Sequence, residues 1–137
     1  MRSTRWPRIV ASGALWTVVY NFVWGIAWFA FMREEWEHAM SAIGRSIPFT
    51  PEVWFLWVVL TLPIGVVIMA FTADRPKRRA MAALSAAGGV WLILAGGTTI
   101  WGLLETLSMR VLALDACVNL VAMVAGALVG IWSQIET

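Results

Sequence analysis

The sequence has almost none of the side chains that hold metals and cofactors. Cys117 is the one cysteine and His38 the one histidine among 137 residues. A lone cysteine cannot form an intrachain disulfide, a structural zinc site normally needs four cysteine or histidine ligands, and a bis-histidine haem needs two histidines. We therefore expect no metal and no bound cofactor, although this count still permits a pigment with one axial ligand.

Charged residues are also few. They make up 13% of the chain, against 61% hydrophobic residues, and the formal net charge is only +2. A soluble protein of this size carries about twice that charged fraction, and a nucleic-acid-binding protein needs a basic face that this chain lacks. These proportions exclude nucleic acid as a partner and indicate one small membrane domain covering residues 1–137.

The common catalytic motifs are missing as well. The chain has no H-E-x-x-H, no serine, histidine and acidic residue in a catalytic pattern, and no glycine-rich phosphate loop after a strand. Asn21 is the most polar residue of the first apolar stretch, where a small four-helix multidrug exporter would carry a carboxylate. We expect no catalytic residues and a protein that is not an enzyme.

Four long apolar stretches fill most of the chain. A helix rises about 1.5 Å per residue, so about 20 residues cross a hydrocarbon core of roughly 30 Å. The sequence therefore predicts an all-α polytopic membrane protein, an antiparallel bundle with transmembrane helices at about 9–32, 53–73, 80–107 and 111–133. The first stretch follows three arginines, as in a signal peptide, but it is too long for one and lacks a small-residue cleavage site. We interpret it as an uncleaved span.

The placement of basic residues predicts the orientation. Arg2, Arg5 and Arg8 precede the first span, and four more basic residues lie at 75–79, so these two segments hold seven of the ten lysines and arginines. Because such residues stay on the cytoplasmic side, both termini are expected in the cytoplasm. Residues 33–52 are then expected outside.

The first connection contains a short amphipathic pattern. Trp36, Ala39, Met40 and Ile43 recur at helical spacing, and Gly44 and Pro48 follow them. We predict a helix over about 34–44 lying on the outer surface, with Trp36 as its anchor. An ordinary solvated loop is the alternative.

Ten tryptophans are unusual in a chain of this length. Most fall near the membrane interfaces, where tryptophan is expected. In the first span, however, Trp16, Tyr20, Trp24 and Trp28 recur every four residues and form one aromatic stripe. Such a stripe packs against lipid or protein, or holds a flat lipophilic ligand, and we weight packing over a dedicated ligand site.

Several polar residues are expected at similar depth on the outer side. Carboxylates inside a membrane are costly and normally face the bundle interior with a partner. We predict that Asp115 meets Arg110, Glu105 or a first-span group such as Asn21. Two interpretations stay open, a ligand- or proton-linked site and a structural lock. The candidate cluster consists of Asn21, Trp24, Trp28, Glu105, Arg110, Asp115 and Asn119.

Glycines mark expected packing seams in the last two spans. Gly89 and Gly96 lie in the third span, and Gly126 and Gly130 are spaced four apart in the fourth. Small residues let membrane helices approach closely. We expect these seams inside the bundle or between chains, with Gly126/Gly130 or the aromatic stripe as surfaces for a protein partner or a second copy.

Two segments resemble a bacterial four-helix inner-membrane family of unassigned activity. The similarity rests on residues 25–29 followed by 36–40, and on Leu114–Asp115 followed by Gly126 and 130–132. It implies the four-helix fold and a bacterial inner-membrane location. The tryptophan content is also similar to that of tryptophan-rich sensory proteins, but these have five spans.

Two functional hypotheses follow from the sequence. The first is a small non-catalytic accessory, assembly or structural component that packs against partner chains and lipids. The alternative is a small transporter or binding protein for a lipophilic ligand, using the aromatic stripe and the polar cluster. A cavity lined by Trp24, Trp28, Glu105 and Asp115 would favour the alternative, and a filled core would favour the first.

Overall fold

The computed structural model describes residues 5–47 and 50–135, and in this part it is all helical with no strand. The long first rod joins α1 (Arg5–Ala27), a π-helical segment (Trp28–Met32) and α2 (Arg33–Ala42). The others are α3 (Pro51–Ala73), α4 (Arg79–Leu104, after a 3-10 turn at Pro76–Arg78) and α5 (Met109–Ile135). Four helices are long and apolar enough to cross a membrane, which confirms the predicted four-helix fold.

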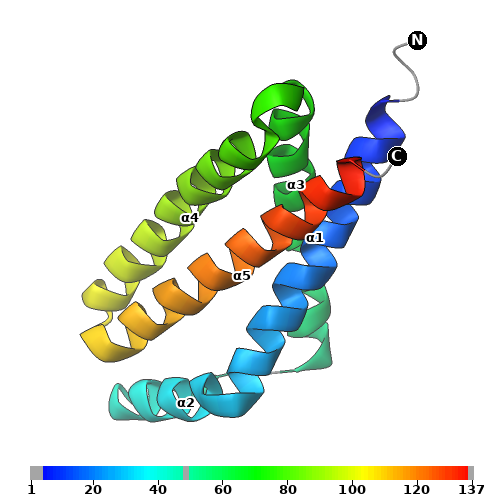
Figure 1. The fold of residues 1–137 in the computed structure, drawn as a ribbon. Coiled ribbons are helices and arrows are strands. Elements are labelled where there is room, and N and C mark those ends of the chain that lie inside the picture. Colours follow the sequence, from blue (N-terminus) through cyan, green and yellow to red (C-terminus); the bar gives the residue numbers. More distant parts are fainter. Residues whose placement is uncertain (1–4, 48–49, 136–137) are drawn as a thin grey trace.

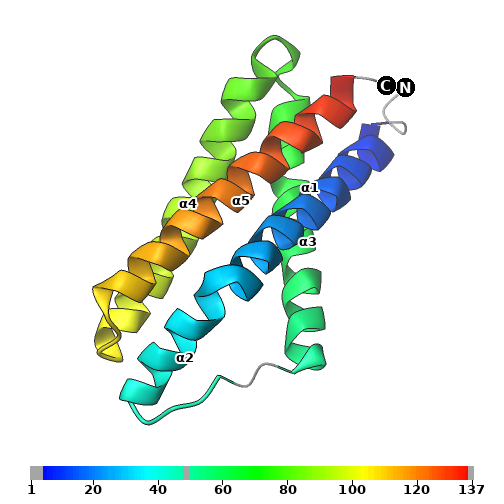
Figure 2. The same ribbon diagram turned by 60° about the horizontal axis from the view of Figure 1, so that its bottom comes forward.

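The four long helices form a bundle in which α5 lies between α1 and α4. Figures 1 and 2 show this order, with α3 behind the other three. α1 packs closely on α5 and α3, and α4 packs on α5 and less extensively on α3. Among the described residues no Cα atom of α1 lies within 8 Å of one in α4, so these two helices form a diagonal of the bundle. Both chain ends lie at one end, called here the terminal end.

The sequence of α3 has a favourable helix start and one proline in its interior. The Thr50 hydroxyl accepts a hydrogen bond from the Val53 backbone N–H at 3.5 Å, and Pro51 occupies the first turn, where its missing N–H costs nothing. Pro63, which cannot donate a backbone hydrogen bond, also lies inside this helix. At its other end, Asp74 pairs with Arg5 of α1, which ties the two helices together at the terminal end.

The predicted amphipathic helix is present as α2, and its position differs from the expectation in one respect. It continues directly from α1 through the π-helical segment and crosses the end of the bundle opposite the termini, called here the α2 end (Figure 1). Its apolar face covers the turn between α4 and α5, and does not merely rest on the membrane surface. The contacts join Trp36, Ala39, Met40 and Ile43 to Leu107, Val111 and Leu112. Pro48, predicted to follow the helix, lies outside the described residues.

Two ion pairs hold α2 and its C-terminal extension on this turn. Glu35 pairs with Arg110 at 2.9 Å, and Arg45 pairs with Glu105 at 3.0 Å. Side chains in both pairs are substantially exposed, so each pair contributes less than about 1 kcal/mol. The position of α2 therefore depends mainly on its apolar contacts. The ion pairs determine which residues of α2 and of the turn lie opposite each other.

Candidate functional site

The aromatic stripe of α1 exists and faces the interior of the bundle. Trp16 stacks on Tyr20 with ring centroids 5.0 Å apart, and Trp24 stacks on Trp28 at 5.2 Å. Trp16, Tyr20 and Trp28 are all at most 4% exposed. Trp16, Tyr20 and Trp28 are therefore not a surface for lipid or for a partner chain, whereas Trp24 is half-buried.

The half of the stripe nearer the terminal end is ordinary core. The Trp16 indole donates a hydrogen bond to the Met123 carbonyl oxygen of α5 at 3.3 Å, and Gly126 leaves room for its ring. A Cβ added at Gly126 would lie 2.9 Å from the Trp16 ring. No space for a ligand remains at this level.

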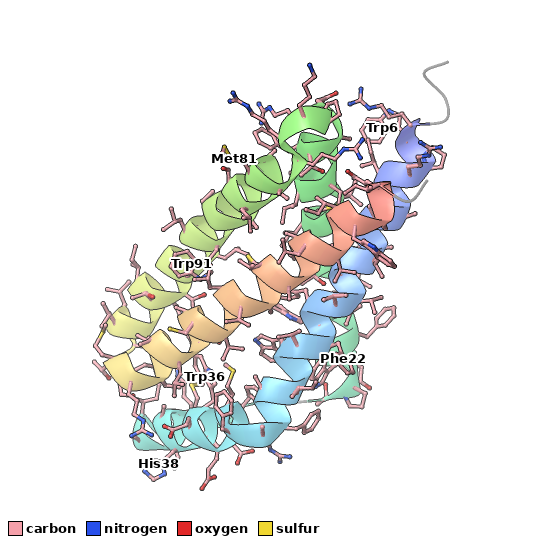
Figure 3. The ribbon with its side chains drawn as sticks, in the orientation of Figure 1. Trp6, Phe22, Trp36, His38, Met81 and Trp91 are labelled. Carbon is pink, nitrogen blue, oxygen red and sulfur yellow. The ribbon has the colours of Figure 1, made fainter. Side chains whose placement is uncertain are left out.

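Nearer the α2 end the bundle is hollow. A cavity of about 280 Å³ lies where α1 and α4 face each other across the diagonal of the bundle. Every helix contributes to its wall, and Trp36 of α2 covers one side. In Figure 3, Trp36 lies on the side of α2 that faces α5, Trp91 lies beside α5, and His38 points the opposite way. The lining residues are Tyr20, Trp24, Trp36, Trp57, Trp91, Leu94, Ala95, Thr98, Asp115 and Asn119.

One wall of the cavity is a chain of polar groups. The Asn119 amide donates to the backbone oxygen of Asp115 at 2.9 Å and to its carboxylate at 3.2 Å. The Tyr20 hydroxyl donates to the Asn119 side-chain oxygen, so the chain joins α1 to α5. The Trp36 side chain approaches the Asp115 carboxylate as a further hydrogen-bond donor. A carboxylate offers about four acceptor sites, so these contacts leave capacity for a ligand.

The rest of the wall is mostly aromatic. The Trp91 indole is fixed by a 2.8 Å hydrogen bond to the Ala116 backbone oxygen of α5. Trp24 and Trp57 meet with ring centroids 6.2 Å apart and an interplanar angle of 40°. The Trp24 indole N–H is buried and has no hydrogen-bond partner among the described residues. Leaving such a donor unpaired costs about 1–3 kcal/mol.

The structure brings together only part of the predicted polar cluster. Trp24, Asp115 and Asn119 line the cavity, and Trp28 supports it by stacking on Trp24. Asn21 instead faces α3, where its amide donates to the Thr61 hydroxyl at 3.0 Å. The intrahelical bond from this amide to the Thr17 carbonyl oxygen holds it in that direction.

Asp115 was predicted to meet Arg110, Glu105 or a first-span group such as Asn21, and among the described residues it pairs with none of these three. Arg110 and Glu105 both lie at the turn between α4 and α5. Each forms an ion pair with a residue of α2 or of the segment that directly follows α2. Arg110 reaches Glu35, and Glu105 reaches Arg45. Asp115 points inward to Asn119 instead, and its link to α1 passes through Tyr20.

The predicted glycine seams divide into two kinds. Gly126 and Gly130 pack inside the bundle, the first against Trp16 and the second against Met69. They are therefore not available to a partner chain. Added Cβ atoms at Gly89 and Gly96 would meet nothing within 4 Å, so these two form no seam inside the bundle.

Close contacts with backbone occur at two glycines that were not singled out. A Cβ at Gly13 would lie 2.7 Å from backbone atoms of Val66, and one at Gly65 would lie 2.5 Å from the Gly13 carbonyl oxygen. These two residues set the distance between α1 and α3. The available signals were the small-residue run Ala11–Ala14 and the single glycine Gly65 among bulky residues.

Three tryptophans of the cavity were not among the predicted site residues. Trp36 was expected to anchor a surface helix, and Trp57 and Trp91 were counted only among the ten tryptophans. On α4 the lining positions 91, 94, 95 and 98 follow helical spacing. The polar Thr98 at the end of that series was the signal that α4 presents this face inward.

Neither a metal site nor a similar known protein indicates what the cavity binds. Among residues 5–47 and 50–135 no three histidine, cysteine or acidic side chains gather as a metal site. Comparisons with protein-family models, curated proteins and solved structures return no match.

Proposed function

We propose that this protein is a non-catalytic integral membrane protein that binds a lipophilic small molecule in the cavity under α2. The observation that carries the proposal is the cavity itself. Its wall draws on every helix and combines indole rings with a fixed polar chain, which is the composition of small-molecule sites.

The cavity favours binding over the accessory role that ranked first from the sequence. Two of the four residues named as its expected lining, Trp24 and Asp115, are present in the wall. The surfaces expected to contact a partner, Gly126/Gly130 and the aromatic stripe, are used inside the bundle. A binding site explains the tryptophans around the cavity without any second chain.

An accessory role stays a second candidate because of α4. Four of its glycines, at 88, 89, 96 and 97, have no atom within 4 Å of an added Cβ, and small residues suit helix contacts in membranes. Native mass spectrometry should then show a retained partner or second copy. Gly89→Ile with Gly96→Ile should abolish that contact, and a monomer under all mild conditions would remove this candidate.

The cavity proposal is tested by filling the cavity. Ala95 lines it, so Ala95→Phe should lower the affinity for a neutral lipophilic fluorophore, N-phenyl-1-naphthylamine, by at least about tenfold. Binding is followed by energy transfer from the tryptophans to the fluorophore in nonionic detergent micelles. The matched control is Ile93→Phe, two residues away on α4 at a side chain that is 76% exposed. Equal saturable binding to wild type and Ala95→Phe would contradict the proposal.

We further propose that both termini are cytoplasmic, in a bacterial inner membrane, so that the α2 end faces outside. The basic residues beside the terminal end support this orientation. In a Cys117→Ser background, an impermeant maleimide applied to intact cells should label Ser41→Cys in α2. It should label Lys77→Cys, between α3 and α4, only after permeabilisation. The opposite pattern would reverse the orientation.

A further inference from the structure

The carboxylate of Asp115 lacks a cation. Among the described residues four ion pairs form, Arg5–Asp74, Arg33–Glu37, Arg45–Glu105 and Arg110–Glu35, and none includes Asp115. The two arginines near the α4–α5 turn are both occupied by other carboxylates. A carboxylate within a membrane span normally has a partner that offsets the cost of its burial. Asn119 and Trp36 offer it hydrogen bonds but no positive charge.

The aromatic walls are suited to a positive charge. The faces of indole and phenol rings attract ammonium ions, by about 2 kcal/mol or more at desolvated sites, and indole is the best of them. Trp24, Trp36, Trp57, Trp91 and Tyr20 surround the same space that Asp115 borders. An anion would be repelled by both kinds of wall, and a neutral molecule would leave the carboxylate without a counter-charge.

A second, apolar space adjoins the cavity. A groove of about 320 Å³ lies beside the first half of α3 and shares Trp24 and Trp57 with the cavity. Trp24 and Trp57, with ring centroids 6.2 Å apart, line both spaces. Apart from them the groove is lined by Ile47, Val53, Trp54, Leu56 and Leu60. An apolar tail that starts in the cavity would reach the groove by displacing one of these two rings.

We propose that the ligand is a lipophilic ammonium ion, with its cationic head between Asp115 and the indole rings and its apolar tail in the groove beside α3. This inference rests on the proposed function, because it names the chemical class that the cavity binds. Binding involves no covalent step. The head supplies the missing charge, and the tail covers apolar surface between Trp24 and Leu60.

The charge is tested with a matched pair of compounds. Benzyltrimethylammonium and neopentylbenzene have the same shape, with nitrogen replaced by carbon in the second. In nonionic detergent, the cation should displace N-phenyl-1-naphthylamine from wild type at a concentration at least about tenfold lower than its neutral analogue. Asp115→Asn keeps the shape of the side chain and should remove most of this preference, with little change for neopentylbenzene.

Two further variants keep the test decisive. If Asp115→Asn does not fold, Trp57→Leu removes one ring at a side chain that is 38% exposed, and should weaken the cation severalfold but not the neutral analogue. For the tail, dodecyltrimethylammonium should bind more tightly than the benzyl compound. Leu60→Trp in the groove should cancel that gain, whereas Leu62→Trp, outside the groove lining, should not.

Lysophosphatidylcholine distinguishes the two sources of such a head group. Displacement at the same concentration as dodecyltrimethylammonium identifies a lipid head group, and much weaker displacement identifies a free organic cation. Both results keep the ammonium chemistry. Equal displacement by benzyltrimethylammonium and neopentylbenzene would overturn the inference while leaving the cavity proposal intact. Loss of the distinction between wild type and Ala95→Phe would overturn both.

Discussion

Gly65→Ala is expected to destabilise the protein strongly or to prevent its folding. Its new Cβ would lie 2.5 Å from the Gly13 carbonyl oxygen and 2.7 Å from the Trp16 ring. The Gly13 carbonyl oxygen belongs to the backbone in the middle of α1, so it cannot move away without separating α1 from α3. Overpacking of this kind costs about 1–3 kcal/mol, occasionally more. The free energy of unfolding in mixed micelles, measured by titration with a denaturing detergent, checks the value.

Gly96→Ala is the matched control for this substitution. A Cβ there meets nothing within 4 Å, and alanine is the better helix former in exposed positions, by about 1 kcal/mol in water. The unfolding free energy should therefore stay the same or rise slightly. If Gly65→Ala were as stable as Gly96→Ala, the close approach of α1 to α3 would be wrong.

Trp16→Ala is expected to destabilise the protein still more, for the opposite reason. This side chain is fully buried, stacks on Tyr20 and bonds to the Met123 carbonyl oxygen. Removing a buried tryptophan side chain costs about 3–5 kcal/mol in soluble cores. In a membrane the lost term is van der Waals packing, which is the main attraction between helices there. Thermal unfolding followed by circular dichroism in detergent should show the loss.

Two comparisons isolate the packing of Trp16. Trp6→Ala removes the same side chain at a position that is 61% exposed and should change the unfolding free energy by less than about 0.5 kcal/mol. Gly126→Ala should destabilise wild type, because its Cβ would meet the Trp16 ring at 2.9 Å. In the Trp16→Ala background it should destabilise less, because only the contact with the residue 16 carbonyl oxygen at 3.0 Å remains. Strict additivity of the two changes would contradict the observed contact.

The helices and the repeat on α1 could be predicted because both depend on local sequence. Length and hydropathy define the spans, and spacing alone predicted that Trp16, Tyr20, Trp24 and Trp28 share a face. The same spacing gave the amphipathic α2. These signals do not say what lies opposite each face, so the stripe was expected at the surface although it is inside.

The site required contacts between distant segments. Arg110 and Asp115 are neighbours in sequence, which suggested a pair, but α2 brings Glu35 to Arg110 from far away along the chain. The position of α2 depends on the π-helical segment (Trp28–Met32). There the chain changes direction, so that α2 crosses the end of the bundle (Figure 1). The cavity likewise exists because α1 and α4 lie on a diagonal. No local pattern encodes which pair of helices will be diagonal.

The most direct test of the central claim is native mass spectrometry of the protein taken from its own membrane in mild detergent. The account predicts that wild type and Ile93→Phe retain a small lipophilic molecule of defined mass at one copy per chain. Ala95→Phe, with its cavity filled, should retain none. Identical spectra for wild type and Ala95→Phe, with or without such a molecule, would contradict a ligand site between the four helices.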